Sequence, residues 1–453
     1  MSRAWLVLAA VAAGCTGSPR DGSPGLGAGA GGSTGGASAS GGSPGTGGAA
    51  SGGSPGTGGA ASGGSPGTGG AASGGSPGTG GAAARGFVHP GLLHGTEDLA
   101  RMKARVAAGA QPWTQGWNRL VANAHAALTW TPRPAAMVYR GANGTNPENY
   151  AQLFNDAAAA YALALRWHIS GDSAYADKAI QVLNAWSAVL TGIDGTSDKF
   201  LASGLYGYQL ANAAELMRAY PGWAAADFAR FRMMMRNVFY AMNHDFLVRH
   251  NGACISHYWA NWDLCNMDSM LAIGVLLDDR AIYDEAVAYF KNGAGNGAID
   301  KAVFFVHPGN LGQWQESGRD QGHNTLGIGL MGALCEMAWK QGDDLYGYGS
   351  NRFLAGAEYV AQYNLGNQVP YVTYDNCDAV NQTVISSSGR GDLRPIWELV
   401  YNHYVVRRGL TAPNVATYAA RVRPEGGGGD YGPNSGGYDQ LGYGTLTATL
   451  DAP

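Results

Sequence analysis

Apolar residues recur at three- and four-residue spacing through nearly the whole chain after residue 86, and this pattern constrains the fold more than any other feature. Such spacing marks one face of an α-helix, whereas the alternation typical of a half-buried strand is almost absent. Helices are predicted at residues 99–109, 149–172, 173–190, 207–220, 225–248, 261–279, 280–293, 323–344, 351–366 and 394–409. The sequence therefore predicts an all-α protein.

Short turns rich in Gly, Asp and Pro join these helices, so consecutive helices should pack as antiparallel hairpins. Hairpins in series form either an open solenoid or a closed α/α toroid. A solenoid would show a repeat of roughly 34 or 40 residues, and none is visible. We therefore predict an α/α toroid, built as an incomplete barrel of about six to seven helical hairpins.

Residues 1–15 have the pattern of a lipoprotein signal peptide. Arg3 precedes an apolar stretch at residues 5–13, and small residues lead into Cys15 as in a lipobox. The stretch is too short to cross a bilayer as a permanent helix. Lipidation of Cys15 would anchor the protein at the bacterial envelope, in the periplasm or at the cell surface. The alternative is an ordinary secretory signal with an incidental cysteine, and both interpretations predict export.

Residues 16–85 form a linker made almost entirely of Gly, Ser, Ala, Thr and Pro. The unit SGGSPGTGGAA recurs with a period of 11, which places the serine before each proline at Ser43, Ser54, Ser65 and Ser76. A segment without large apolar residues cannot offset the entropy of ordering, so we predict a disordered tether. No second linker follows, and residues 86–453 are predicted to form one catalytic domain.

The composition excludes several classes of partner and cofactor. A net charge of −4 argues against nucleic acid. The four cysteines after Cys15 (Cys254, Cys265, Cys335 and Cys377) lack zinc-finger spacing, and disulfides among them are possible in an exported protein, with the pairing left open. We found no nucleotide-binding loop and no metal motif. The prediction is a monomer without cofactor or metal, which meets the membrane only through its lipid anchor.

Polar and aromatic residues gather where helices are expected to begin. In an α/α toroid the N-termini of one ring of helices meet at one face of the cavity, and their free N–H groups favour anionic ligands. Tyr208 and Gln209 are therefore predicted to contact the substrate, as are Arg390 and Arg394. Helix capping and packing for the first pair, and ordinary surface charge for the arginines, are the alternatives.

The stretch QWQESGRDQGHN at residues 313–324 carries two acids, an arginine and a histidine at helical spacing. Arg319 and His323 are four residues apart, so they should share one face of a helix and address one ligand. The stretch SHYWANWDLCN at residues 256–266 combines His257, Tyr258 and Asn261 with two tryptophans. A structural histidine is the alternative for His257.

Three segments resemble the alginate-lyase-domain proteins of the α/α-toroid polysaccharide lyases, and the closest match is polysaccharide lyase family 38. They are NWDLCNMDSMLAIGVLLDDRAIYDEAVAYFKNGAGNGAI, QWQESGRDQGHNTLGIGLMGALCEMAWKQGDDLYG and RPIWELVYNHY. The resemblance covers nearly all of residues 87–453. It implies a lyase that cleaves a uronate-containing polysaccharide, alginate or glucuronan, by β-elimination.

The resemblance also implies roles for single residues. Asn261 is similar to the asparagine of an Asn-Trp pair that neutralises the uronate carboxylate in toroid lyases. Arg319 and His323 match the arginine and histidine of a Gln/Gly-rich turn, with His323 as the base. Elimination also needs an acid at the leaving oxygen, and related lyases carry a tyrosine several residues after that histidine.

Residues 324–333 contain no tyrosine, so the acid remains open. Tyr258 is the first candidate, and a tyrosine from another helix, such as Tyr208 or Tyr404, is the second. His257 completes the predicted catalytic set.

Two other functions fit the same pattern less well. A glycoside hydrolase on this fold needs two carboxylates that flank the scissile bond, and Glu316 and Asp320 are too close on one helix to do so. A glycan-binding lipoprotein without catalytic activity would keep the groove but not the chemistry.

Overall fold

The computed structural model describes residues 86–431 and 438–451. The predicted signal peptide with Cys15 and the predicted linker at residues 16–85 lie outside the described residues. The chain from Arg85 onward forms a unit of its own.

The helices follow the predicted periodicity and pair in series along the chain. The pairs are α1 (Thr96–Ala107) with α2 (Trp113–Ala122), α3 (Tyr150–Ser170) with α4 (Ser173–Val189), α5 (Lys199–Met217) with α6 (Ala225–Met234) and α7 (Ala241–Arg249), α8 (Ala260–Leu277) with α9 (Arg280–Asn292), α11 (Gln321–Lys340) with α12 (Tyr348–Asn364), and α13 (Trp397–Tyr401) with α14 (Pro413–Val422). The short helices α10 (Ile299–Ala302) and α15 (Gly444–Thr447) lie outside these pairs. A π-helical turn, Met235–Tyr240, joins α6 to α7, and a second, Asn402–Arg407, extends α13.

One member of each pair lies on the inside, and the inner helices α3, α5 and α8 run parallel. Gly204 and Gly207 on α5 face Cys265 and Ser269 on α8 in the same order along both helices, and a β-carbon at either glycine would collide with its neighbour. On α3, the first residue stacks near Tyr206, and His168 Nε2 lies 2.8 Å from the carbonyl of Leu216. Every residue of α8 is buried. The N-termini of these helices therefore meet at one end of the barrel.

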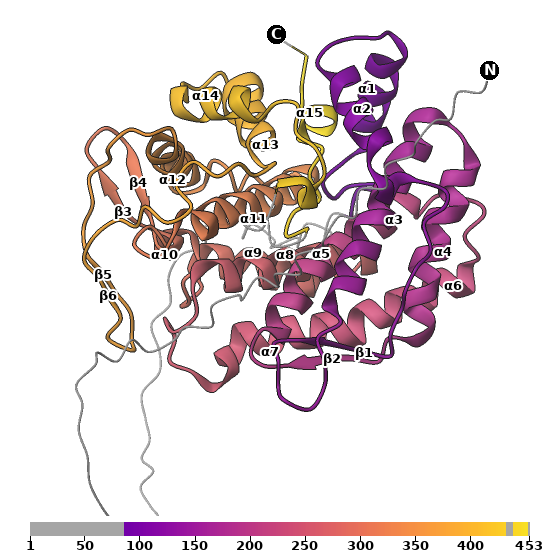
Figure 1. The fold of residues 1–453 in the computed structure, drawn as a ribbon, viewed down its shortest axis with the longest axis horizontal. Coiled ribbons are helices and arrows are strands. Elements are labelled where there is room, and N and C mark those ends of the chain that lie inside the picture. Colours follow the sequence, from indigo (N-terminus) through magenta and orange to yellow (C-terminus); the bar gives the residue numbers. More distant parts are fainter. Residues whose placement is uncertain (1–85, 432–437, 452–453) are drawn as a thin grey trace, which may run out of the picture. The chain divides into compact units, whose positions relative to one another are not determined.

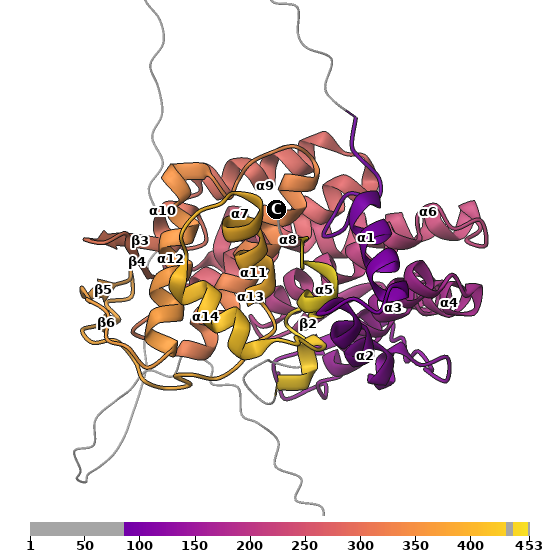
Figure 2. The ribbon, with the colours of Figure 1, turned by 90° about the horizontal axis from the view of Figure 1, so that it is seen from above.

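The C-terminal segment closes the ring between the last hairpin and the first. Helix α15 contacts α13 on one side and α1 and α2 on the other, as Figures 1 and 2 show. Arg101 Nη2 donates to the carbonyl of Thr447 at 3.0 Å, and Trp113 Nε1 donates to that of Thr449 at 3.2 Å. Leu450 N donates to Asn402 Oδ1 at 2.9 Å. The predicted α/α toroid is confirmed, with its gap filled by the end of the chain.

Three short two-stranded sheets were not predicted, because their strands are too short for alternation to be recognised. Strand β1 (Met137–Arg140) pairs parallel with β2 (Gly192–Gly195), and β3 (Val303–His307) pairs antiparallel with β4 (Leu311–Trp314). Strand β5 (Tyr374–Asp375) pairs antiparallel with β6 (Asn381–Gln382). All belong to connections between helices, and β4 leads directly into the stretch that precedes α11.

At two helix starts the difference from the prediction affects the predicted site. Helix α5 begins at Lys199, so Tyr208 and Gln209 lie in its middle rather than at its mouth. Helix α11 begins at Gln321 with Asp320 as its N-cap. Arg319 therefore lies in the turn before the helix and does not share a helical face with His323.

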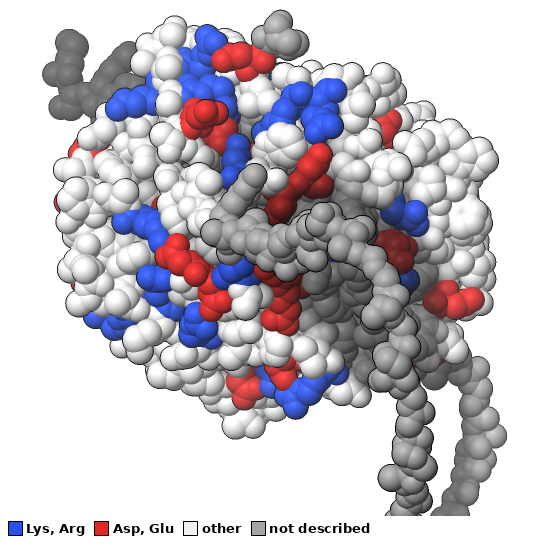
Figure 3. Space-filling view, turned by 180° about the vertical axis from the view of Figure 1, so that it is seen from behind, with Lys and Arg blue, Asp and Glu red and all other residues white. Residues whose placement is uncertain are grey.

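Across the described ranges, no helix is long and apolar enough to cross a membrane. On the face seen in Figure 3, acidic and basic residues lie in small mixed groups, and most of the surface carries neither charge.

Candidate active site

The N-terminus of α8 is held by the stretch between β4 and α11. Ala260 N donates to Gln315 Oε1 at 3.0 Å, and Asn261 N donates to Glu316 Oε2 at 3.3 Å. The first N–H groups of a helix have no partner within the helix, so side chains from elsewhere must satisfy them. This capping brings the two predicted site segments together, although 55 residues separate the bonded residues.

Glu316 joins Asn261 to Arg319. The second oxygen of its carboxylate accepts a hydrogen bond from Arg319 Nη1 at 2.8 Å. The Arg319 guanidinium also lies 5.3 Å from the ring centre of Trp259, the residue just before α8. Burial raises the pKa of the Glu316 carboxyl above its usual range, although Arg319 opposes the shift. This fully buried acid fixes a cation beside the helix start that carries Asn261.

His323 is paired with Asp320. Asp320 Oδ1 accepts from the backbone N–H of His323 at 2.8 Å, and Oδ2 lies 2.6 Å from His323 Nδ1. Burial favours the neutral acid, but the hydrogen bonds from His323 outweigh it and hold the pKa of Asp320 below its usual range. A bond at Nδ1 sets the tautomer and direction of the ring. The side chain of His323 is 36% exposed, so its Nε2 can meet a ligand.

The side-chain amide of Asn261 has an oxygen without a hydrogen-bond partner among the described residues. The residue is 2% exposed, and within the described part of the chain its Oδ1 has no hydrogen-bond partner. A buried polar atom without a partner costs roughly 1–3 kcal/mol, and a ligand that donates to this oxygen would recover that cost. Asn261, Arg319 and His323 thus lie around Glu316 and Asp320 at one end of the barrel.

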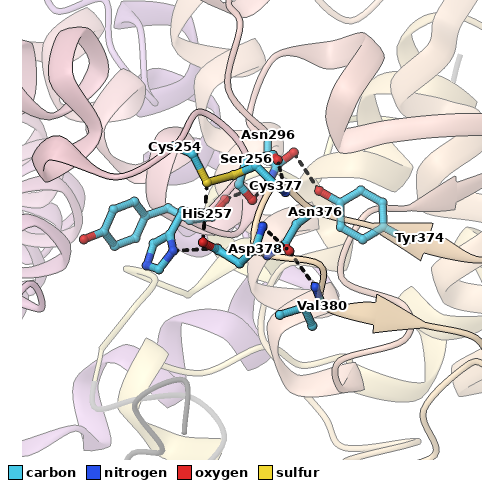
Figure 4. Close-up of a disulfide and its surroundings, with 10 residues drawn as sticks. Cys254, Ser256, His257, Asn296, Tyr374, Asn376, Cys377, Asp378 and Val380 are labelled. Carbon is cyan, nitrogen blue, oxygen red and sulfur yellow. Dashed lines mark hydrogen bonds and ion pairs between the residues drawn. A yellow bond between two sulfur atoms is a disulfide. The ribbon is translucent and has the colours of Figure 1, made fainter. Parts of the chain in front are cut away.

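His257 and Tyr258 lie in the loop before α8. His257 Nδ1 is 2.6 Å from Asp378 Oδ2, and the side chain is 33% exposed (Figure 4). Tyr258 is 7% exposed, and its hydroxyl accepts a hydrogen bond from Asn251 Nδ2 at 2.9 Å. The histidine is thus the more accessible of the two, and both catalytic roles stay predictions.

The same loop contains the only disulfide among the described residues, between Cys254 and Cys377, while Cys265 and Cys335 are free and buried. Sulfur and carboxylate atoms of Cys254, Cys377 and Asp378 lie within 4.8 Å of one another, a spacing that could suit a metal. Both sulfurs are consumed by the disulfide, so this group offers no thiolate ligand.

The residues predicted to bind substrate on α5 are enclosed instead. Tyr208 is 2% exposed, and its hydroxyl donates to the carbonyl of Asp439 at 3.0 Å. Gln209 is fully buried and donates to the carbonyl of Tyr438 at 2.5 Å. Because α5 begins earlier than predicted, both side chains face the C-terminal segment inside the ring. Their contacts are those of packing residues, which was the alternative stated for them.

The two arginines before α13 are also engaged within the protein. Arg394 is buried and donates to Asp439 Oδ2 at 3.2 Å and Gln440 Oε1 at 3.0 Å. Arg390 donates to the carbonyls of Tyr363 and Asn367, both at 2.7 Å, and stacks on the Tyr363 ring. Arg394 is thus enclosed, whereas Arg390 is half-buried and its guanidinium holds the end of α12.

The remaining acid candidates on other helices are poorly placed. Tyr404 is fully buried in the π-helical turn after α13, and its hydroxyl donates to the carbonyl of Tyr346 at 2.9 Å. Tyr208 is committed in the same way. Both hydroxyl donors are thus used within the fold, and the catalytic roles of these tyrosines stay predictions.

Arg140 and Tyr374 are two buried polar residues that the sequence did not single out. Arg140, in β1, is buried against Tyr206 and Tyr150, with Nη1 3.1 Å from the Tyr206 hydroxyl. Tyr374, in β5, lies 6.4 Å from the Trp259 ring and donates to Asn296 Oδ1 at 3.0 Å, and burial raises its pKa. Both belong to short strands without a motif, so no local signal could have found them.

The carboxylates do not form a hydrolase pair. Glu316 is fully buried in its ion pair with Arg319, and Asp320 caps α11. Both lie on the same short stretch of chain, so they cannot stand on opposite sides of a sugar.

A family model described as Alginate lyase matches residues 107–370, which include all of α8, β4, α11 and α12. The chain belongs to the alginate lyase family. It is a polysaccharide lyase, as the resemblance implied. No curated protein is similar enough in sequence to count as a relative.

Solved structures of alginate lyases share the fold. An alginate lyase from Bacteroides ovatus superposes with a TM-score of 0.56 at 14% identity, covering 80% of this chain and 100% of that one. Alginate lyase A1-III from Sphingomonas species A1 gives a TM-score of 0.52 at 14% identity, covering 78% and 95%. A histidine-to-alanine variant of A1-III complexed with a tetrasaccharide gives 0.52 at 15%, covering 78% and 94%.

Proposed function

We propose that this member of the alginate lyase family cleaves a uronate-containing polysaccharide, alginate or glucuronan, by β-elimination. The observation that carries the proposal is the gathering of Asn261, Arg319 and His323 around two buried or half-buried acids at one end of the barrel. The tetrasaccharide complex of the A1-III variant supports an oligosaccharide as the ligand of this fold.

The chemistry requires neutral and positive donors. Removal of the C5 proton builds negative charge on the adjacent carboxylate, and donors that strengthen as this charge develops lower the barrier. In this proposal the Asn261 amide and the Arg319 guanidinium bind that carboxylate. The Asn261 Nδ2 donates to that carboxylate, while Glu316 keeps Arg319 in place.

His323 is proposed as the base. Its Nε2 takes the C5 proton, the released electron pair forms the C4–C5 double bond, and the C4–O4 bond breaks. The departing O4 then needs a proton, and the candidates are the accessible His257 and the more buried Tyr258 on the loop before α8. Asp320 stabilises the imidazolium that forms on His323.

The assay is ultraviolet absorbance, because the new double bond is conjugated with the carboxylate. Purified protein should generate absorbing products from at least one of polymannuronate, polyguluronate and glucuronan, and His323→Ala should abolish the signal. New reducing ends without absorbance would indicate hydrolysis, and binding without either product would indicate a glycan-binding protein. Both results contradict the proposal.

We also propose that the protein is exported as a monomer and anchored through a lipid on Cys15 at the bacterial envelope. The lipobox-like run before Cys15 and the Gly/Ser-rich linker support this. Mass spectrometry of the mature N-terminus should find a diacylated cysteine. An unmodified N-terminus after residue 15 would refute the anchor. Membership of polysaccharide lyase family 38 stays a prediction.

A further inference from the structure

The loop that carries His257 is fastened to the β5–β6 hairpin, although 123 residues separate the two cysteines that join them. Beside the Cys254–Cys377 disulfide, Cys377 N donates to Ser256 Oγ at 2.8 Å. The hairpin turn is itself closed by Asn376, whose Oδ1 accepts from the backbone N–H groups of Asp378 and Val380, both at 2.9 Å. Figure 4 shows Asp378 between the disulfide and the imidazole of His257.

Asn296 adds a buried second fastening. Its Nδ2 donates to the carbonyls of Ser256 at 3.1 Å and Tyr258 at 2.8 Å, and its Oδ1 accepts from the Tyr374 hydroxyl. The residues on either side of His257 are therefore bound to the same side chain that holds β5. The loop and the hairpin form one rigid piece.

This fastening gives an exposed ion pair an unusual geometry. The side chains of His257 and Asp378 are 33% and 39% exposed, yet they approach to 2.6 Å through Nδ1. Exposed pairs generally gain little, because two flexible side chains must be ordered together. Here the disulfide and the Asn376 turn order Asp378 beforehand. A carboxylate fixed at Nδ1 leaves Nε2 as the nitrogen that faces a ligand.

The arrangement repeats the Asp320–His323 pair. Each aspartate binds Nδ1 of its histidine at 2.6 Å, and each histidine lies on a segment attached to the start of α8. Elimination needs two proton-transfer groups, one at C5 and one at O4. The Tyr258 phenol is largely buried, whereas the His257 imidazole is accessible.

We propose that Asp378 is a positioning residue for His257, that the Cys254–Cys377 disulfide holds it in place, and that His257 protonates the leaving O4. The inference rests on the proposed elimination. In the step, the imidazolium of His257 gives its Nε2 proton to O4 as the C4–O4 bond breaks. The Nδ1 proton stays on the His257 ring, hydrogen-bonded to Asp378. After the step, His323 releases to water the proton taken from C5, and His257 takes up a proton from water at Nε2.

The first test compares Asp378→Asn with Asp375→Asn, an exposed acid on the same hairpin. Asp378→Asn should lower kcat about a hundredfold, the scale of a general acid, with little change in KM, while Asp375→Asn stays within about twofold of wild type. Asp378→Glu should restore part of the loss. Wild-type kcat in Asp378→Asn would overturn the proposal.

The second test uses a uronoside with an activated leaving group at C4, such as 4-nitrophenolate, which departs without a proton. Asp378→Asn and His257→Gln should be nearly as fast as wild type on this compound. An equal loss on both substrates would mean that the pair serves the structure or the C5 step, and the proposal would fail.

The third test concerns the disulfide. Cys254→Ser with Cys377→Ser, assayed well below its melting temperature, should reproduce the loss of Asp378→Asn, and combining all three changes should add little, because they act through one contact. Fully additive losses would refute the role of the disulfide. The ¹⁵N spectrum of His257 tests the positioning without any measurement of activity. Nδ1 should always carry a proton in wild type, whereas Asp378→Asn should show a mixture of the two neutral tautomers. If wild type makes no unsaturated product, the proposed function fails. The spectrum would still show whether Asp378 orients the His257 ring.

Discussion

Replacing Asn261 by alanine separates catalysis from stability, because the two depend on different atoms of this residue. Its backbone N–H caps α8 by donating to Glu316, and that bond survives the substitution. Its side-chain Oδ1 has no partner in the described part of the protein. The substitution therefore breaks no hydrogen bond at Oδ1. It also removes a buried polar atom whose desolvation is not compensated in the folded protein. We expect the free energy of unfolding to change by less than about 1 kcal/mol.

The expected effect on turnover is far larger. Loss of one donor to a charge that develops in the transition state costs about 10²–10³ in kcat, or about 2.7–4 kcal/mol. Since the interaction strengthens only as the C5 proton leaves, KM should change little. Initial rates of absorbance increase over a range of polyuronate concentrations give kcat and KM directly.

Asn266 is the matched control on the same helix. It is fully buried, and its Nδ2 donates to the carbonyl of Trp262 at 2.8 Å, while its Oδ1 accepts from Asn243 Nδ2 at 2.7 Å. Asn266→Ala removes both of these buried hydrogen bonds, so it should cost about 1–3 kcal/mol of stability and leave kcat nearly unchanged in the folded enzyme. The reasoning is refuted if Asn261→Ala turns over within threefold of wild type, or if it is destabilised as much as Asn266→Ala.

Three further outcomes are expected. Arg319→Lys should lower kcat about ten- to a hundredfold at unchanged stability, because an ammonium group cannot hold the planar contacts of guanidinium; steady-state kinetics and thermal melts check both. Burial, reinforced by the charge of Glu398, raises the pKa of Glu425 from 4.5 to about 8. The folded state then binds more protons than the unfolded state between these values, so stability should fall as pH rises through this window. Denaturant titrations should show a weaker decline in Glu425→Gln, and an unchanged decline would contradict the assignment. Removing the Cys254–Cys377 disulfide should cost about 2–4 kcal/mol, because it closes a long loop in the unfolded chain; an unchanged urea midpoint would contradict this.

The architecture could be predicted because helical periodicity is a local property. The apolar spacing located most inner and outer helices, and the short turns between them implied hairpins in series. Residues 199–206 were missed as the start of α5 because this helix is buried on all sides, so it has no polar face and no amphipathic pattern. Because of that error, Tyr208 was predicted at the start of the helix, although it lies in the middle.

The composition of the site was also visible in the sequence, but its pairing was not. Asp320 and His323 are three residues apart, and their contact follows from helix capping. Asp378 and His257 are 121 residues apart, and only the folded chain shows that they meet. The same holds for Glu316, whose two partners come from a helix start and a turn. Contacts of this kind depend on tertiary packing, which local patterns do not encode.

The closure of the ring by α15 has a consequence for how the chain folds. The contacts that join the first hairpin to the last residues span very long sequence separations, 346 residues for Arg101 and Thr447. During synthesis the earlier hairpins can stack only as an open arc until residues 444–450, which join its two ends, have emerged. Formation of the ring is therefore a late event in folding, and the unjoined ends of the arc expose apolar surface until it occurs. Folding speed should be limited by this long-range closure rather than by any helix.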